Sequence, residues 1–295
     1  MESDPFSPSS SNRRLLTGLL GAPIAQSAAP SMHERAAEAL GLRCHYQLIE
    51  VPGAGREELR LLLEGVRWLG FAGINVTFPY KEAVVGLLDE LSPGAARIGA
   101  VNTVVVRANR LIGHNTDTTG FARAVAPLVT ASSGPVALIG AGGVGKAIAF
   151  ALAGLGVTDL RIFDCEPAQA ARLMAQLEGH TTAAIAESVE AALRGAAGAV
   201  NASPVGMLPS VATPVPDHLL HAGLWVADAV YSPLWTPFLK AARAKGATVM
   251  TGRELAIYQA ADAFELFTGL KPSIDEIGIA FDAVMAGRYA AADAV

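Results

Sequence analysis

Residues 136–146 read Val-Ala-Leu-Ile-Gly-Ala-Gly-Gly-Val-Gly-Lys, and this stretch decides the fold class. Val136–Ile139 is a continuous apolar run, typical of a strand that a parallel sheet buries on both faces. The loop that follows matches the pattern G-x-G-x-x-G, and a helical pattern comes after it. A glycine-rich loop between a strand and a helix is the context in which this motif binds a dinucleotide.

Three glycines of the loop have separate physical roles in such a site. Gly140 permits the tight turn, Gly142 lets backbone N–H groups approach a pyrophosphate, and Gly145 lets the helix pack closely on the strand. The N-terminus of the helix favours the negative phosphates. The alternative interpretation is that this loop is an ordinary tight turn that binds no cofactor. We predict cofactor binding by the loop as a whole, through Gly140, Ala141, Gly142, Gly143, Val144 and Gly145.

A second apolar run, Leu160–Phe163, ends in Asp164, 19 residues after Gly145. Dinucleotide sites place at this position the acid that holds the adenine ribose hydroxyls. A carboxylate there also repels a 2′-phosphate, so Asp164 predicts NAD in preference to NADP. An aspartate that only caps a turn is the alternative interpretation of this residue.

Strand and helix patterns alternate on both sides of the loop, which implies βαβ units, parallel sheets and right-handed crossovers. A Ser/Gly/Pro connection at residues 129–135 marks a candidate domain boundary. Before it we predict strands at Leu15–Leu20, His45–Val51 and Phe71–Val76, a hairpin of Val101–Val106 with Arg110–Gly113, and helices at Met32–Leu40, Arg56–Leu69, Lys81–Leu88 and Thr118–Ala126. After it we predict further strands at Ala199–Asn201 and Leu224–Asp228, and helices at Lys146–Leu155, Pro167–Leu177, Glu254–Phe267 and Ile274–Ala286.

Composition excludes several classes of protein. Hydrophobic residues make up 52% and charged residues 17%, which is incompatible with intrinsic disorder. The net charge of −5 argues against a nucleic-acid partner, and two cysteines cannot form a disulfide scaffold. Residues 1–14 begin acidic and polar, unlike a signal peptide, and are expected to form a loose tail. Glycines and Lys146 interrupt Val136–Thr158, the most apolar stretch, so we expect a cytoplasmic protein without a membrane partner.

Polar side chains follow the predicted strand ends of the first half, where α/β proteins bind ligands. Asn75-Val-Thr77-Phe-Pro-Tyr-Lys81 contains the only lysine of the first 145 residues, and a desolvated amine can exchange protons near neutral pH. Asp117 follows a later strand, and Asn102 lies in a segment of small residues. A solvated lysine at a helix start and a helix-capping aspartate are the alternatives. Ser27, in a turn-rich loop, could equally cap a helix.

Taken in order, these motifs resemble the shikimate/quinate dehydrogenase family. The pattern runs Gly-x-Pro-Ile-x-x-Ser, Asn-Val-Thr-x-Pro-x-Lys, Gly-Ala-Val-Asn-Thr, Asn-Thr-Asp and Gly-Ala-Gly-Gly, and residues 201–207, 228–237 and 259–261 agree with it. The resemblance implies an α/β fold with a cleft between two domains. An N-terminal α/β substrate domain would span residues 1–122, completed by C-terminal helices within 252–295, and a Rossmann-type doubly wound NAD-binding domain would span residues 123–251.

The resemblance also implies a reaction, the reversible NAD-dependent oxidation of the C3 hydroxyl of shikimate or quinate to the 3-dehydro ketone. Lys81 and Asp117 match the catalytic pair of the family. Binding roles are implied for Thr77, Asn102 and Gln259 at the ring hydroxyls, for Ser27 and Tyr231 at the ring carboxylate, and for Asn201 and Gly252 at the cofactor. No metal is implied, because the histidines and cysteines show no ligand spacing.

Two positions depart from the family pattern. Ala29 stands where a second hydroxyl residue is usual, so one hydrogen bond to the carboxylate, about 1.5–3 kcal/mol, would be missing. Asp164-Cys-Glu replaces the Asn-Arg-Thr of the biosynthetic, NADP-using branch. Two alternatives therefore stay open: the same chemistry on a related ring acid such as aminoshikimate, and a non-catalytic paralogue that binds NAD or a metabolite. The expected assembly is a monomer or homodimer.

Overall fold

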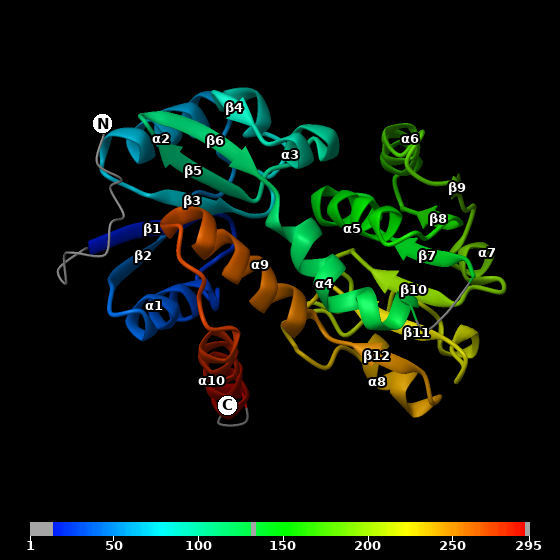
Figure 1. Ribbon diagram of the computed structural model, residues 1–295. Helices are drawn as coiled ribbons and strands as arrows, with labels where there is room; N and C mark the ends of the chain where they lie inside the picture. The colour runs from blue at the N-terminus through cyan, green and yellow to red at the C-terminus, as the bar shows by residue number, and fades with distance from the viewer. Residues whose placement is uncertain (1–13, 131–133, 293–295) are drawn as a thin grey trace. The chain divides into compact units, whose positions relative to one another are not determined.

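The computed structural model describes residues 14–130 and 134–292, with side chains up to residue 288 (Figure 1). The chain divides into two compact units. Unit 1 comprises the residues up to Thr116 and those from Gln259 onward, and unit 2 comprises Asp117–Tyr258. The predicted tail at residues 1–14 lies outside the described residues except for Arg14, which begins the first strand.

Unit 1 is built on a sheet in the order β2-β1-β3-β5-β6-β4. Strand β1 pairs in parallel with β2 and β3, whereas β5 runs antiparallel to β3 and β6. Its elements are β1 (Arg14–Gly21), α1 (Ala29–Ala39), β2 (Arg43–Glu50), α2 (Arg56–Trp68), β3 (Gly73–Val76), the short 3₁₀ turn η1 (Val85–Leu87), β4 (Glu90–Leu91), α3 (Pro93–Ile98), β5 (Thr103–Arg107), β6 (Arg110–His114), the C-terminal part of α9 (Gly252–Thr268) and α10 (Ile274–Ala292).

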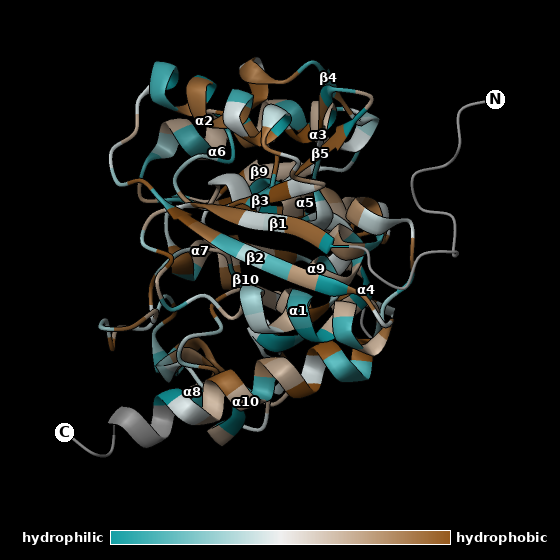
Figure 2. Cartoon of the chain, turned by 90° about the vertical axis from the view of Figure 1, so that its left-hand side faces the viewer, coloured by the Kyte–Doolittle hydropathy of each residue, from teal (hydrophilic) through white to brown (hydrophobic). Residues whose placement is uncertain are grey.

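The sheet of unit 1 is covered on both faces. The apolar stripe of α2, which contains Leu59 and Leu63, packs against Val104 on one face. The next residue, Val105, points to the opposite face and contacts Phe267 of α9. Figure 2 shows the consequence for sequence composition: β1, in the interior of the sheet, is mostly apolar, whereas the neighbouring edge strand β2 alternates with polar residues.

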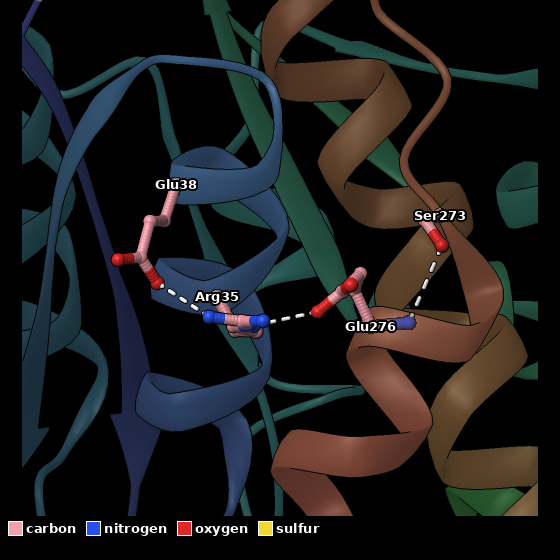
Figure 3. Close-up of polar contacts among 4 residues, drawn as sticks. All are labelled: Arg35, Glu38, Ser273 and Glu276. Carbon is pink, nitrogen blue, oxygen red and sulfur yellow. Dashed lines mark hydrogen bonds and ion pairs between the residues drawn. The ribbon is translucent and has the colours of Figure 1, made fainter.

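Helices α1 and α10 lie side by side in unit 1, and a polar contact joins them (Figure 3). The Nε atom of Arg35 donates to Oε2 of Glu276 at 2.6 Å, and its NH1 atom donates to Glu38 at 2.9 Å. Ser273 accepts a hydrogen bond from the backbone N–H of Glu276 and so caps α10. The ion pairs are exposed and therefore contribute little to stability, so the apolar contacts of the C-terminal helices hold them in unit 1.

Unit 2 contains a wholly parallel sheet in the order β12-β11-β10-β7-β8-β9. Numbered from its own first strand, this order is that of the doubly wound dinucleotide-binding fold, which confirms the predicted fold class. Its elements are α4 (Thr116–Thr130, from Asp117), β7 (Val136–Ile139), α5 (Gly143–Gly154), β8 (Leu160–Phe163), α6 (Pro167–Gln176), β9 (Ala183–Ile185), α7 (Val189–Leu193), β10 (Gly198–Asn201), η2 (Asp217–Leu219), β11 (Trp225–Asp228), α8 (Pro237–Ala244), β12 (Thr248–Met250) and the start of α9.

Most predicted elements exist, with ends displaced by a few residues, and two helix predictions need correction. Lys81–Leu88 is not an α-helix but a series of turns that ends in η1. The predicted helix Thr118–Ala126 does not stop at Pro127, which lies within the last turn of α4 and removes one N–H donor from the helix. The short elements β4, α3, β9, α7, α8 and β12 were not predicted, because a few residues carry too little periodicity.

The predicted hairpin is present as β5 and β6. Ala108 and Asn109 connect the strands with φ values of +48° and +59°, as the tight two-residue turn of a hairpin requires. Within the described residues, no helix is both long and apolar enough to span a bilayer.

Candidate active site

The glycine-rich loop of unit 2 connects β7 with α5, at the point where the sheet order reverses. Gly140 has φ +103°, and a Cβ atom there would stand 2.8 Å from the backbone of Ala202 and Ser203. At Gly145 a Cβ atom would stand 2.2 Å from the carbonyl oxygen of Gly140. Only glycine fits either position. Because the loop itself forms the first turn, α5 begins at Gly143 and not at the predicted Lys146.

Gly142 lies at the N-cap of α5, and no atom lies within 4 Å of the place its Cβ would take. The first N–H groups of a helix have no partner within the helix and attract anions. Oδ2 of Asp164 accepts a hydrogen bond from the N–H of Ala141 at 2.7 Å, and its Oδ1 accepts from the N–H of Glu166 at 2.8 Å. Asp164 therefore lies beside the loop and also stabilises its own turn, so both interpretations of this residue are compatible with the geometry.

The ends of β10 and β11 form the next part of this sheet edge. The buried amide of Asn201 donates to Oδ1 of Asp228 at 2.9 Å and to the carbonyl of Val205 at 3.0 Å. Asp228 also accepts from the hydroxyl of Thr236 and the N–H of Val230. Burial raises the pKa of Asp228 to about 6, although these three donors oppose the shift. The two side chains hold the loops after both strands in place.

Gly252 and Tyr231 also belong to this edge of unit 2. A Cβ atom at Gly252, the first residue of α9, would stand 2.5 Å from the carbonyl oxygen of Val230. Gly252 therefore lets the start of α9 approach the loop after β11. Tyr231 follows in that loop and is half-buried.

In unit 1, the turn after β3 carries Thr77 and Lys81. The N–H of Thr77 donates to the carbonyl of Leu20, and the carbonyl of Lys81 accepts from the N–H of Val101 at 2.8 Å. The buried hydroxyl of Tyr80 donates to the carbonyl of Val51 and accepts from the N–H of Ala54. Three backbone segments therefore fix this turn, and Lys81 is half-buried.

Asn102 lies beside that turn, because its carbonyl accepts from the N–H of Val76 at 2.8 Å. Its Oδ1 atom accepts from the N–H of Thr116 at 2.7 Å, and its Nδ2 donates to the hydroxyl of Thr116 at 3.0 Å. Asp117 is the next residue, buried at 6% exposure in the first turn of α4. The N-cap interpretation of Asp117 is therefore wrong, since the residue lies inside the helix. The backbone contacts bring Thr77, Lys81 and Asn102 to one strand edge.

Ser27 and Gln259 lie on other elements of unit 1. The Ser27 hydroxyl accepts from the N–H of Ala29, the first residue of α1, at 3.2 Å. This contact stabilises the turn just before α1, whose N-cap residue is Ala28 and not Ser27, and Ser27 is half-buried. The N–H of Ala22 donates to the carbonyl of Phe78, so the loop that carries Ser27 begins next to the Lys81 turn. Gln259 is half-buried on α9.

Sequence reasoning did not single out Tyr46, Asn75 or Asp228, although their polar groups are buried among the residues above. Asn75 is the first residue of the motif at residues 75–81, so the motif itself points to it. Nothing in the sequence around Tyr46 distinguishes this residue from a tyrosine that only packs in the core. Within residues 14–130 and 134–292, no group of three or more histidine, cysteine, aspartate or glutamate side chains is arranged to hold a metal ion.

A family model of the shikimate dehydrogenase substrate binding domain matches residues 19–104. The chain is 44% identical over 265 residues to shikimate dehydrogenase (NADP(+)) of Streptomyces avermitilis, an alignment that covers 87% of this chain and 91% of that protein. It is 42% identical over 276 residues to quinate/shikimate dehydrogenase (NAD(+)) of Corynebacterium efficiens, which covers 90% and 97%.

Solved structures give the same result. Quinate dehydrogenase from Corynebacterium glutamicum in complex with NAD has a TM-score of 0.84 and 38% identity, over 92% of this chain and all (100%) of that one. Shikimate 5-dehydrogenase from Thermus thermophilus in complex with NADP(H) and shikimate has a TM-score of 0.82 and 39% identity, over 92% and 99%. The similar proteins therefore include both NAD and NADP enzymes.

Proposed function

The chain belongs to the shikimate/quinate dehydrogenase family of oxidoreductases, and we propose that it oxidises shikimate, quinate or both reversibly at the C3 hydroxyl. The observation that carries the proposal is the strand edge of unit 1, where backbone hydrogen bonds hold Thr77, Lys81 and Asn102 together. A lysine and polar side chains at the carboxyl ends of strands are suited to a polar ring ligand.

Lys81 and Asp117 are the proposed catalytic pair. Oxidation of an alcohol releases a proton from oxygen as the hydride leaves carbon, and the bound nicotinamide accepts the hydride. The Lys81 amine relays the proton, and the Asp117 carboxylate orients the reacting hydroxyl and the amine. The link between Asn102 and Thr116 supports this assignment, because it anchors the residue before Asp117 to the same strand edge.

The remaining ring contacts are proposed from the resemblance to the family. Thr77, Asn102 and Gln259 bind ring hydroxyls, and Ser27 and Tyr231 bind the ring carboxylate. Residues 1–122 with 252–295 then serve as the substrate domain, and residues 123–251 serve as the dinucleotide domain. The compact units divide the chain close to these positions, which supports the assignment.

NAD is the proposed cofactor, in preference to NADP. The open N-terminus of α5 and the close approaches at Gly140 and Gly145 fit a pyrophosphate on residues 140–145. Asn201 and Gly252 complete the proposed cofactor site, because they hold the loops at the same sheet edge. Each carboxylate oxygen accepts more than one hydrogen bond, so Asp164 can bind ribose hydroxyls while it holds Ala141. Its charge disfavours a 2′-phosphate.

A related ring acid such as aminoshikimate is the second candidate substrate. Ala29 motivates this candidate, because it departs from the family pattern and leaves a ring carboxylate with one hydroxyl partner fewer at the start of α1. A ring acid that makes a stronger polar contact elsewhere, for example through an amine, would offset that loss.

The test is a kinetic matrix of shikimate, quinate and aminoshikimate with NAD and NADP, in the wild type and in Lys81→Ala. We expect NAD-dependent turnover of shikimate or quinate, and a loss of about 10²–10⁴-fold in kcat in the variant. Binding of NAD, measured by calorimetry, should be unchanged. Lys240→Ala, at an exposed lysine of α8, is the matched control.

Three outcomes would contradict parts of the proposal. Turnover of aminoshikimate alone would favour the second candidate. An absence of turnover with every ring acid would favour a non-catalytic paralogue. Undiminished kcat in Lys81→Ala would remove Lys81 from the reaction.

A further inference from the structure

A chain of buried polar side chains runs through unit 1 from β2 to the start of α4. It consists of Tyr46 on β2, Asn75 on β3, Thr103 on β5, Asn102 just before β5, and Thr116. Each residue is at most 6% exposed. Buried polar groups without partners are costly, so such a chain is stable only when every link is made.

The hydrogen bonds of the chain have a defined direction. The Tyr46 hydroxyl donates to Oδ1 of Asn75 at 2.8 Å. Nδ2 of Asn75 donates to the hydroxyl of Thr103 at 3.0 Å and to the carbonyl of Asn102 at 3.3 Å. The Thr103 hydroxyl in turn donates to Oδ1 of Asn102 at 3.0 Å.

The direction of these hydrogen bonds determines where the oxygen and the nitrogen of the Asn102 side-chain amide lie. The Thr103 hydroxyl accepts from Asn75, so its single proton is available for the next link: Oδ1 of Asn102 lies at 3.0 Å, closer than the Thr116 hydroxyl at 3.4 Å. Oδ1 of Asn102 therefore faces Thr103 and the N–H of Thr116, and Nδ2 is the donor end of the amide, which donates one hydrogen bond to the Thr116 hydroxyl at 3.0 Å. The Tyr46 hydroxyl imposes the orientation at the far end, because an O–H can donate only to the oxygen of Asn75.

The ring of Tyr46 is itself held in the core. It packs on the ring of His33, with 4.7 Å between the ring centroids, and only 3% of Tyr46 is exposed. A rigid, buried ring holds its hydroxyl in one place, so the geometry of the first link to Asn75 is well defined.

We propose that Tyr46, Asn75 and Thr103 are positioning residues, which fix the Asn102 amide so that its Nδ2 end serves as the donor to a substrate ring hydroxyl. This inference rests on the proposed substrate role of Asn102. It assigns no contact with the substrate to the three positioning residues, and it makes the orientation of Asn102 depend on the Tyr46 hydroxyl of β2, which is three strands away from β5 in the sheet.

A double-mutant cycle tests the inference. Tyr46→Phe removes the hydroxyl and keeps the ring, so we expect kcat/KM for the ring acid to fall about 3- to 10-fold, mainly through KM. The Kd for the dinucleotide should not change. In the background of Asn102→Ala, the same substitution should change kcat/KM less than about twofold, because the amide that it orients is gone.

Tyr80→Phe is the matched control. Tyr80 is also a buried tyrosine of unit 1, but its hydroxyl bonds to Val51 and Ala54 and not to the chain. Tyr80→Phe should change kcat/KM by the same factor in the wild type and in the Asn102→Ala background.

A second pair of variants keeps the inference testable if Tyr46→Phe does not fold. Thr103→Val removes the last donor of the chain and should lower kcat/KM only when Asn102 is present. Thr103→Ser restores a hydroxyl and should recover most of the activity.

The outcomes separate this inference from the proposed function. If Asn102→Ala lowers kcat/KM but Tyr46→Phe and Thr103→Val have the same effect in both backgrounds, the inference is wrong and the site assignment stands. If Asn102→Ala leaves kcat/KM unchanged, or the wild type oxidises no ring acid, the site assignment fails and the inference fails with it.

Discussion

His33 offers a direct test of how burial controls the pH dependence of stability in unit 1. Its ring on α1 is 2% exposed and lies between the rings of Tyr46, Phe264 and Phe267, at centroid distances of 4.7–6.2 Å. Its Nδ1 atom has no hydrogen-bond partner among the described residues. Burial lowers the pKa of His33 from 6.5 to about 3, because the apolar surroundings disfavour the imidazolium.

The sign of the effect follows from the two pKa values. Between pH 6.5 and about 3, the unfolded chain binds a proton at His33 and the folded chain does not. The contribution of His33 to stability is therefore complete above pH 6.5 and is lost as the pH falls. At about 1.4 kcal/mol per pH unit, the loss approaches about 5 kcal/mol near pH 3.

Urea unfolding followed by circular dichroism from pH 7.5 to pH 4, in the wild type and His33→Leu, measures this contribution. We expect the variant to be at least as stable as the wild type at pH 7, because it removes an unpaired buried nitrogen. Between pH 4 and 6, the free energy of unfolding of the variant should depend less steeply on pH than that of the wild type. The difference in slope should correspond to about one bound proton. His45→Leu, which replaces an exposed histidine of β2, is the matched control for the substitution itself. An unaltered slope in His33→Leu would refute the reasoning.

Three further predictions follow from the site. Gly145→Ala places a methyl group 2.2 Å from the carbonyl oxygen of Gly140, so we expect a stability loss of several kcal/mol in thermal unfolding, whereas Gly154→Ala, where nothing lies within 4 Å, should be neutral or stabilising. Ala29→Ser restores a hydroxyl at the start of α1, and KM for the ring acid should fall at least about tenfold in steady-state assays; an unchanged KM would exclude the carboxylate from that position. Asp164→Asn removes the charge that repels a 2′-phosphate, and the ratio of kcat/KM for NAD to that for NADP should fall at least about tenfold; a constant ratio would assign Asp164 a purely structural role.

Local sequence predicts structure best where one segment contains the whole signal. The run Val136–Ile139 with its glycine loop predicted a strand, a turn and a helix, and all three are present. The hairpin at Ala108-Asn109 and the helix α2 were also predicted from local sequence. The turn residues of the hairpin and the apolar spacing of the helix each lie within a short segment. The helix wrongly predicted at Lys81–Leu88 shows the limit, since contacts from distant segments hold that turn.

Sequence alone determined the fold class and the residue types available for chemistry. Periodicity and the loop glycines act over short distances along the chain, so they can be read without any tertiary contact. The order of motifs also identified the family, through its resemblance to known sequences. It did not determine how the side chains would be oriented.

Only the tertiary structure decided which distant residues meet. Phe267 of α9 occupies the space that a Cβ at Gly73 would need, so the C-terminal helices return to the sheet of unit 1. The bond from Tyr46 to Asn75 likewise joins two strands that are separated by β1. Contacts of this kind depend on burial and hydrogen-bond geometry across the whole unit, and no local pattern in the sequence encodes them.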